Sequence, residues 1–282
     1  MKRNVIIAVV LIVIVLIYFA CSKSNFSFEE TVVPGITKGD LLNPVYNRFK
    51  NRFETGNTFF GKDIRGIDAI YVITMPQRKG YISEQMKKLG VKFVYFNAIK
   101  PSDLSTEDQD ALSTVNIPGT QIYKKYTRLA VGLSFGMCFM DSLVKGYKNI
   151  MVFEDDLVIE TSSISEGVQE FLNSKCDIFY MGYCYANCGN VRNNGYRHLV
   201  ELTDRNILCC HSLCIKTWFL PQLLDHCFPM KFNSDEQFRN FYISNKINVC
   251  IPKKVYFKQN RETVKSLNES KDDPEFFKTC QF

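Results

Sequence analysis

One stretch of the chain joins the pattern of a buried strand to a cluster of charge. Apolar residues 150–153, Ile-Met-Val-Phe, run directly into Glu154, Asp155 and Asp156, called the acidic triplet below. A short apolar run without alternation is typical of a strand buried on both faces, as in parallel sheets. Ionised carboxylates cannot share that burial without partners, so we expect them where the strand emerges at its C-terminal end. In open α/β sheets, ligands bind at that edge.

The acidic triplet has two interpretations. Alternation along the strand predicts Glu154 and Asp156 on one side and Asp155 on the other. Two carboxylates that converge on one point suit a hard divalent cation such as Mn²⁺ or Mg²⁺. The alternative is a solvated acidic turn. The position of the triplet, directly after a buried strand, favours a binding site.

The amino terminus has the composition of a membrane segment. Residues 5–20 are apolar apart from the amphipathic Tyr18. With Cys21, the segment reaches the lower limit for a spanning helix, about 17 residues, and exceeds the usual core of a signal peptide. We expect an uncleaved signal-anchor over residues 1–21. Cleavage after Ala20 is the alternative, which the bulky Tyr18 at the minus-three position disfavours.

Flanking charges and cysteine usage predict the compartment. Lys2 and Arg3 precede the apolar run and should remain cytoplasmic. The remainder would then lie in the Golgi or ER lumen or outside the cell, as a single-pass type II membrane protein. Asn25 and Asn268 begin N-glycosylation sequons, which fit this topology. In an oxidising compartment the 11 cysteines should form disulfides, and the odd number leaves at least one thiol free.

Length and composition allow one large domain with a sizeable core, since 46% of the 282 residues are hydrophobic. We expect a stem over 22–66, which lacks periodicity, then a domain over 67–260 and a polar tail over 261–282. The net charge of +6 arises from interspersed signs without a basic block, so no nucleic-acid partner is expected.

The domain shows the alternating pattern of an α/β protein. Residues 69–73 read as a buried strand, and apolar residues at helical spacing follow, ending at Gly90. A second strand at 92–96 completes a strand–helix–strand unit, which indicates a parallel sheet. A long amphipathic helix then precedes the acidic strand, and 177–182 reads as a further strand.

From Ile67 to Gln259 the order of motifs resembles glycosyltransferase family 25, which includes bacterial lipooligosaccharide galactosyltransferases and collagen galactosyltransferases. The matching segments are 69–75 with Arg78, Gly132-Leu133-Ser134, Gly146, 152–156, 177–182, 210–213, Asp235-Glu236, Pro252 and Gln259. Two positions depart from the family pattern. Phe135 replaces a His that usually follows the Ser of the long helix, and Tyr81 replaces a second Arg after the first strand.

The resemblance implies a fold, a reaction and a set of partners. The fold is of the GT-A type, a Rossmann-like, mostly parallel sheet flanked by helices. The reaction is a metal-dependent, inverting transfer of a hexose, galactose or glucose, from a UDP-sugar to a hydroxyl group of a glycan or glycoprotein. Asp156 would bind the Mn²⁺ or Mg²⁺ directly, and Glu154 would bind it through water or contact the donor ribose. Asp155 is a further donor-binding candidate.

An inverting transfer also needs a base that takes the proton of the acceptor hydroxyl. The resemblance points to Asp235 or Glu236 for this catalytic role. The alternative is structural, because acids are favoured in the first turn of a helix. Ser234 and Gln237 form a capping box that would explain this helix start by itself.

Three further residues are candidates for binding the donor. Thr74 and Arg78 follow the first strand, where a nucleotide would lie, and Arg78 would pair with the diphosphate. A solvated turn arginine is the alternative. His211 would contact the donor or complete the metal shell. A buried histidine satisfied by hydrogen bonds is the alternative there.

Cysteines gather between residues 184 and 214, around His211. In a reducing cytosol such a cluster would suggest zinc, but the spacing matches no standard finger and the expected anchor favours disulfides. Adjacent Cys209 and Cys210 in a strand would point to opposite faces, so we expect them to have different partners.

Two other functions remain open from the sequence. One is a nucleotide-sugar- or glycan-binding module on the same fold that has lost catalysis, which Phe135 and Tyr81 would fit. The other is a hydrolase that uses Glu154 and Asp156 as a carboxylate pair. Turnover assays separate the first from a transferase, and metal dependence separates the second.

Overall fold

The computed structural model describes residues 31–56, 61–114, 122–161, 163–260 and 280. The expected anchor, the two sequon asparagines and the expected tail apart from Cys280 lie outside the described residues. Residues Val32–Phe282 form one compact unit.

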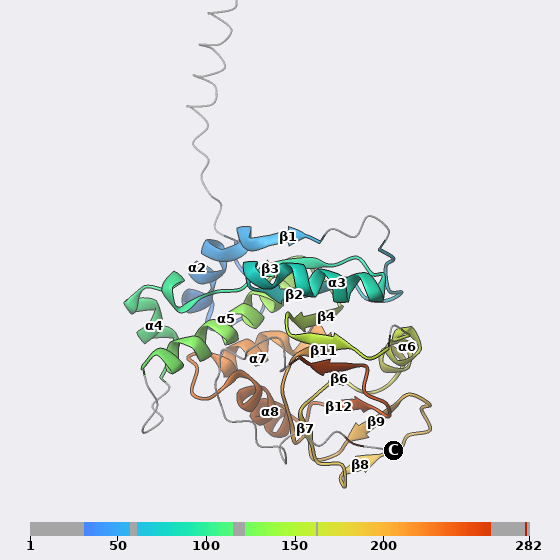
Figure 1. Cartoon of the computed structure of the whole chain (residues 1–282). Helices are drawn as coiled ribbons and strands as arrows, with labels where there is room; N and C mark the ends of the chain where they lie inside the picture. The colour runs from blue at the N-terminus through green and yellow to red at the C-terminus, as the bar shows by residue number, and fades with distance from the viewer. Residues whose placement is uncertain (1–30, 57–60, 115–121, 162, 261–279, 281–282) are drawn as a thin grey trace, which may run out of the picture. The chain divides into compact units, whose positions relative to one another are not determined.

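A central sheet dominates this unit, with nine strands among the described residues in the order β1-β3-β2-β4-β11-β6-β12-β9-β8 (Figure 1). These strands are β1 (Phe53–Thr55), β2 (Ala69–Thr74), β3 (Val94–Asn97), β4 (Asn149–Glu154), β6 (Ile178–Gly182), β8 (Val191–Arg192), β9 (Leu199–Leu202), β11 (Ser212–Lys216) and β12 (Val249–Pro252). Two small sheets pair β7 (Tyr185–Ala186) with β10 (Ile207–Leu208) and β5 (Leu157–Ile159) with β13 (Phe257–Gln259).

The sheet is mixed. β3, β2 and β4 pair in parallel, and so do β6 and β12. β11 lies between β4 and β6 and is antiparallel to both, so β4 and β6 point the same way. Most strands therefore share one direction, as expected, while β1, β9 and β11 run against it. The mixed α/β class is confirmed, and the antiparallel β11 is the feature that the strand–helix–strand reading did not predict.

Helices cover both faces of this sheet and make three layers. They are α2 (Gly39–Phe49), α3 (Lys79–Leu89), α4 (Thr106–Leu112), α5 (Ile122–Val144), α6 (Ser165–Asn173), α7 (Leu220–Cys227) and α8 (Ser234–Asn245), with the 3₁₀ turns η1 (Lys50–Arg52), η2 (Pro76–Arg78), η3 (Pro101–Asp103) and η4 (Thr217–Phe219). One buried cluster joins α2, α5, α7 and α8 to the sheet. A second joins α3 and α6 to the other face.

The central strand β4 is buried on both faces, as its apolar run predicts. Ile150 and Val152 belong to the cluster under α5, and Met151 and Phe153 belong to the cluster under α3 and α6. Continued alternation places Glu154 on the α5 side of the sheet. The strand ends there, and a turn follows.

Part of the expected stem, 22–66, belongs to the folded core instead. Leu42, Tyr46 and Phe49 of α2 are at most 3% exposed and pack in the cluster with α5. β1 then extends the sheet by pairing with β3. Leu42, Val45, Tyr46 and Phe49 follow helical spacing, but Pro44 lies among them and favoured the interpretation of this segment as a stem. The folded unit thus begins well before Ile67, which corrects the expected boundary.

Within the described part of the chain, one helical segment is long and apolar enough to cross a membrane by composition, Tyr126–Val144 of α5. About 72% of that segment is buried inside the unit. It is the core helix that packs on β2 and β4, and its apolar character serves the protein interior.

Candidate functional site

The acidic triplet lines a pocket at the C-terminal end of β4. The pocket has a volume of about 150 Å³ and lies between the ends of β2 and β3, the middle of α5 and the strand β13. Its lining residues are Ile73, Met75, Arg78, Ala98, Ile99, Val131, Ser134, Phe135, Glu154, Asp155, Asp156 and Gln259. This is the edge at which α/β sheets bind ligands, and the sequence placed the acids there.

Asp155 is held by the turn that follows β2. The main-chain N–H of Met75 donates to its Oδ2 at 2.7 Å, and Arg78 Nη1 pairs with its Oδ1 at 3.0 Å. The side chain is 6% exposed. The strand ends before Asp155, so the expected alternation does not extend to it, and Asp155 lines the same pocket as its two neighbours. Its contacts fix Arg78 at the pocket wall.

Asp156 keeps one oxygen without a partner. Gln259 Nε2 donates to Oδ2 at 2.7 Å, while Oδ1 is buried and makes no hydrogen bond with the described residues. Burial raises the pKa of Asp156 to about 6, the nearby charge of Asp155 adds to the rise, and the Gln259 hydrogen bond opposes it. A buried carboxylate oxygen that faces a pocket without a donor is suited to a cation.

Glu154 is buried beside other acids. Its main-chain N–H donates to the carbonyl of His211 at 3.0 Å, which continues the β4–β11 ladder. Burial raises the pKa of its carboxyl well above the usual value, and the charges of Asp156, Asp155 and Asp235 raise it further. The charge of Arg78 opposes this rise. An added positive charge in the pocket would relieve the repulsion.

Asp235 and Glu236, the two expected base candidates, have different environments. Asp235 Oδ2 accepts from the main-chain N–H of Cys209 at 3.3 Å, so it faces the loop before β11. Burial raises the pKa of Asp235, and main-chain hydrogen bonds, including those from Cys209 and Glu236, lower it. Glu236 accepts from the N–H of Asn233, which is the N-cap of α8, and these two residues form the capping box. The expected box of Ser234 and Gln237 is therefore wrong by one residue. Glu236 therefore caps the start of α8, whereas the charge of Asp235 acts on Glu154. Neither acid is among the residues that line the pocket.

Thr74 and His211 are not brought into the pocket. Thr74 is fully buried and its hydroxyl donates to the carbonyl of Met75. His211 is 1% exposed, and its ring lies against Gly182, since a side chain added at Gly182 would meet His211 Nε2. Neither residue is among those that line the pocket.

The pocket also contains residues that were not site candidates. Gln259 fitted only the family's C-terminal pattern, yet it holds Asp156 from β13. Ser134 accepts from the main-chain N–H of Ile99 at 3.0 Å and so ties α5 to the loop after β3. Phe135 is 1% exposed and packs edge-on against Phe238 of α8. The Gly132-Leu133-Ser134 segment, which matched the family pattern, was the feature of the sequence that could have indicated that α5 lines the pocket.

The two departures from the family pattern both have structural partners. Phe135 fills the interior between α5 and α8. The Tyr81 hydroxyl donates to the carbonyl of Leu157 at 3.0 Å and accepts from Asn260 Nδ2 at 2.8 Å. Tyr81 thus links α3 to Leu157, directly after the acidic triplet, and to Asn260, directly after Gln259.

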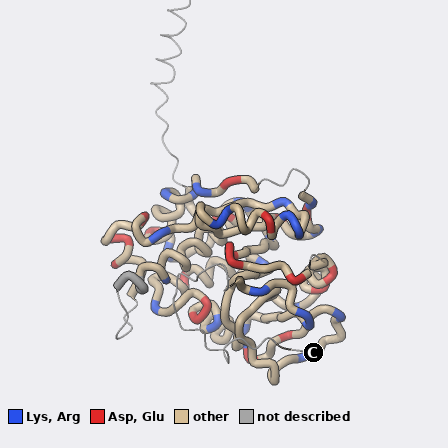
Figure 2. The backbone as a smooth tube through the Cα atoms, viewed as in Figure 1, with Lys and Arg blue, Asp and Glu red and all other residues tan. Residues whose placement is uncertain are grey.

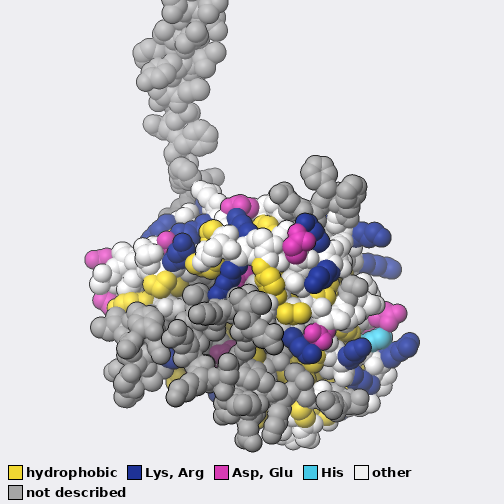
Figure 3. Space-filling model, in the orientation of Figure 1, with side chains coloured by type: hydrophobic (Ala, Val, Ile, Leu, Met, Phe, Trp, Pro, Cys, Tyr) yellow, Lys and Arg dark blue, Asp and Glu magenta, His cyan; other side chains and the backbone are white. Residues whose placement is uncertain are grey.

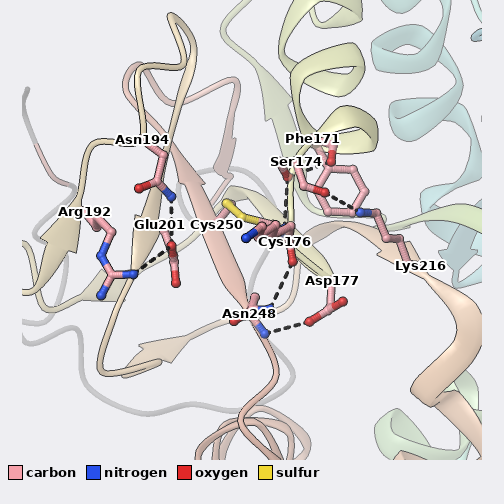
Figure 4. Close-up of a disulfide and its surroundings, with 11 residues drawn as sticks. Phe171, Ser174, Cys176, Asp177, Arg192, Asn194, Glu201, Lys216, Asn248 and Cys250 are labelled. Atoms are coloured by element: carbon pink, nitrogen blue, oxygen red, sulfur yellow. Dashed lines mark hydrogen bonds and ion pairs between the residues drawn. A yellow bond between two sulfur atoms is a disulfide. The ribbon is translucent and has the colours of Figure 1, made fainter.

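Six of the ten described cysteines form disulfides, namely Cys176–Cys250, Cys184–Cys209 and Cys188–Cys280. Figure 4 shows the first, which joins the residues before β6 to β12. Cys209 is bridged and its neighbour Cys210 is a buried thiol near Tyr180, so the two have different partners, as expected. The bridge between Cys184 and Cys209 also removes two ligands from the zinc alternative.

Charges of both signs alternate along the backbone (Figure 2), and the visible surface mixes charged and apolar side chains in small groups (Figure 3). In the view drawn, no extended patch of a single sign appears among the described residues.

Comparison with known proteins points to one family. A family model described as glycosyltransferase family 25 (LPS biosynthesis protein) matches residues 67–212, more than half of the chain. No curated protein matches. Among solved structures, the chain shows similarity to a putative glucose-1-phosphate thymidylyltransferase from Bacillus anthracis in complex with a sucrose. That structure has 13% identity, covers 67% of this chain and 69% of its own, and has a TM-score of 0.33, too low to support an argument. On the family match, this chain belongs to glycosyltransferase family 25.

Proposed function

We propose that this glycosyltransferase uses a divalent cation, Mn²⁺ or Mg²⁺, to move a hexose from a UDP-sugar to a hydroxyl group of a glycan or glycoprotein, with inversion at the sugar. One observation carries the proposal. The acidic triplet lines a pocket at the ligand-binding edge of the sheet, and Asp156 Oδ1 is buried there without a hydrogen-bond donor among the described residues.

The donor set of the pocket fits a hard cation. Asp156 would bind it directly and Glu154 would bind it directly or through water, both with oxygen. No group of three or more His, Cys, Asp or Glu among the described residues is arranged to hold a metal alone. A Mg²⁺-type site commonly uses one or two carboxylates and completes its shell with substrate phosphates and water. When bound, the ion would neutralise charge on the departing diphosphate.

Arg78 and Asp155 would serve the donor together. Asp155 accepts from Arg78 Nη1 and holds the guanidinium at the pocket wall. An arginine fixed in this way has a defined direction, and a planar guanidinium suits diphosphate oxygens. Thr74 and His211 would support the donor site indirectly, by packing, since their side chains do not line the pocket.

Asp235 is the better supported of the two base candidates. Glu236 is engaged as a helix cap, whereas Asp235 faces the loop before β11. A pKa raised by burial brings a carboxylate closer to neutral pH, where a general base works best. In the proposed step, Asp235 takes the proton of the acceptor hydroxyl. The hydroxyl oxygen forms its bond to the anomeric carbon as the bond to UDP breaks.

We also propose a membrane-anchored, luminal or extracytoplasmic enzyme. The apolar residues 5–20 after Lys2 and Arg3 support an anchor with its amino terminus in the cytoplasm. The disulfides support an oxidising compartment. Protease protection of the catalytic domain in sealed vesicles tests this topology, and digestion from the cytoplasmic side would contradict it.

A donor screen tests the function. The full-length protein in detergent is incubated with a panel of nucleotide sugars, with Mn²⁺ or with EDTA, and donor consumption is measured. We expect turnover of a UDP-hexose that needs the cation. Asp156→Asn should reduce it by at least about 10²–10³-fold, the usual effect of losing one positioned electrostatic group.

Controls separate the alternatives. Turnover in EDTA equal to that in Mn²⁺ would contradict the metal-dependent mechanism and revive the hydrolase alternative. Binding of UDP and Mn²⁺ without any turnover across donors and acceptors would favour the inactive binding module.

A further inference from the structure

The Cys184–Cys209 disulfide lies on the side of the sheet where β4 ends in the acidic triplet. Cys184 follows the end of β6, and Cys209 follows β10 and precedes β11. The bridge closes the small β7–β10 ribbon, in which Leu208 pairs with Tyr185. Because β6 and β4 point the same way, the C-terminal end of β6 lies on the side of the sheet where β4 ends in Glu154.

On one side, the bridge contacts the proposed base. The main-chain N–H of Cys209 donates to Asp235 Oδ2 at 3.3 Å. Cys209 has a φ of 69°, in the left-handed region that a residue with a side chain seldom adopts. The disulfide restrains this unusual turn, and the turn aims the N–H at the carboxylate.

On the other side, the bridge contacts the residue that holds the proposed metal ligand. Cys184 Sγ lies 3.5 Å from Gln259 Oε1, and Gln259 Nε2 donates to Asp156 Oδ2 at 2.7 Å. A disulfide sulfur has no proton to donate, so the first contact is one of packing. It fixes the amide of Gln259 in the orientation that points its NH₂ group to Asp156.

We propose that the Cys184–Cys209 disulfide is a positioning element of the transfer site, which holds the base Asp235 and the Gln259–Asp156 pair at a set separation. The inference rests on the proposed function. Transfer needs the acceptor hydroxyl, placed by the base, to meet a sugar whose diphosphate is held near Asp156. A bridge that contacts both halves reduces their independent motion.

The Cys176–Cys250 disulfide provides a matched control. Cys176 precedes β6, so this bridge begins at the opposite end of the strand from Cys184. Its surroundings are the hydrogen bonds of Ser174, Asp177 and Asn248, none of which is a site residue. It closes a separation of 74 residues, compared with 25 for Cys184–Cys209. Its removal should therefore destabilise the fold at least as much.

The test compares two double variants of the full-length protein, Cys184→Ser with Cys209→Ser and Cys176→Ser with Cys250→Ser. The first should lower kcat by about 10- to 100-fold, the effect of a small misplacement of reacting groups. Its Kd for UDP in the presence of Mn²⁺ should change less than its kcat. The control variant should keep kcat within about twofold of the wild type, although its melting temperature falls.

A second measurement covers the case in which the first variant does not fold. Dithiothreitol reduces a disulfide to two thiols and is itself oxidised to its cyclic disulfide, so graded treatment opens the bridges of the wild-type protein. Alkylation and mass spectrometry report which bridge has opened. In samples kept free of the alkylating agent, loss of kcat should parallel the opening of the Cys184–Cys209 bridge, and reoxidation of those samples should restore it.

Each outcome decides between the explanations. Equal loss of kcat in both double variants, or loss that parallels the opening of the Cys176–Cys250 bridge, would overturn the positioning role and leave the bridge as a structural element. An unchanged kcat in the Cys184→Ser, Cys209→Ser variant would do the same. Absence of turnover in the wild type would instead contradict the proposed function.

Discussion

The raised pKa of Asp156 affects both the stability of the folded protein and the proposed binding of a cation. Its pKa is raised to about 6 from a usual value of 3.8, so the folded, metal-free protein binds a proton more tightly than the unfolded chain does. The protonated form stabilises the fold fully below the unfolded pKa, and that contribution is lost as the pH rises through about 6. A site that repels its own charge at neutral pH is prepared for a cation.

The raised pKa of Asp156 predicts how the stability of the metal-free protein changes with pH. In EDTA, the free energy of unfolding of the wild type, relative to Asp156→Asn, should fall by about 2 kcal/mol between pH 4.5 and pH 7.5, because Asn does not ionise. Urea unfolding at the two pH values measures it. A difference that rises with pH would show that Asp156 has a favourable partner in the folded state.

The two acids at the start of α8 should respond differently to neutralisation. Asp235→Asn should reduce kcat by about 10²–10⁴-fold while leaving UDP and Mn²⁺ binding nearly unchanged, because a base acts on the acceptor. Glu236→Gln retains an oxygen for the Asn233 N–H and should affect the melting temperature more than kcat. Full activity in Asp235→Asn, together with inactive Glu236→Gln, would exchange the two roles.

At the scale of elements, α2 determines where the domain begins. Its residues Leu42, Val45, Tyr46 and Phe49 are nearly fully buried, and the Tyr46 hydroxyl donates to Asp141 of α5 at 3.3 Å. Removing the helix would expose this apolar surface of α5 and leave the buried Asp141 with fewer donors.

Two truncations test this boundary. A fragment that begins at Thr31 should unfold cooperatively, whereas one that begins at Ile67 should lack fixed near-UV circular dichroism or aggregate. Leu42→Ala in the longer fragment should cost about 2–5 kcal/mol, the usual range for a buried leucine. A well-folded fragment from Ile67 would restore the original boundary.

The segment after α2 also supports a wall of the pocket. Arg52 of η1 donates to the carbonyl of Ala98 at 3.2 Å and pairs with Asp103 at 2.8 Å, so it holds the loop after β3 that lines the pocket. Arg52→Met should raise the donor KM by about tenfold, or about 1.4 kcal/mol, with little change in kcat. An unchanged KM would mean that the loop keeps its position without Arg52, through the hydrogen bonds of Ala98 to Thr74 and of Ile99 to Ser134.

At the scale of the whole molecule, the disulfides tie the last third of the chain together. Cys188–Cys280 joins the loop after β7 to a residue near the carboxyl terminus, and Cys176–Cys250 joins β12 to the segment before β6. Buried thiols, in contrast, are found in α5, α7 and β11 and next to β11. Bridges therefore concentrate where the segments are short and loop-rich.

Reduction should consequently weaken the molecule as a whole. Each native disulfide typically contributes about 2–4 kcal/mol, mainly by restricting the unfolded chain. Thermal unfolding in a reducing agent should show a melting temperature at least about 5 °C lower than under oxidising conditions. An unchanged melting temperature would indicate that the cysteines are not bridged in solution.

Local patterns in the sequence were sufficient for the central strand and its acids. An unbroken apolar run can be satisfied only by burial on both faces, and three adjacent carboxylates can be tolerated only where such a strand ends. The same reasoning predicted the C-terminal glycine of α3, since Gly90 has a φ of 64°. These features depend on neighbours within a few residues, so the sequence alone determines them.

Tertiary structure decided what those acids do. Asp155 is paired with Arg78 from 77 residues away, Asp156 with Gln259 from 103 residues away, and Asp235 is linked to Cys209 across 26 residues. The docking of α2 and the insertion of β11 against the direction of its neighbours also depend on distant segments. Charge interactions and packing join residues that are distant in the sequence, whereas periodicity gives information only about neighbouring residues in the sequence. The sequence therefore determined which edge of the sheet carries the chemistry, and only the fold decided which acid keeps an oxygen free for it.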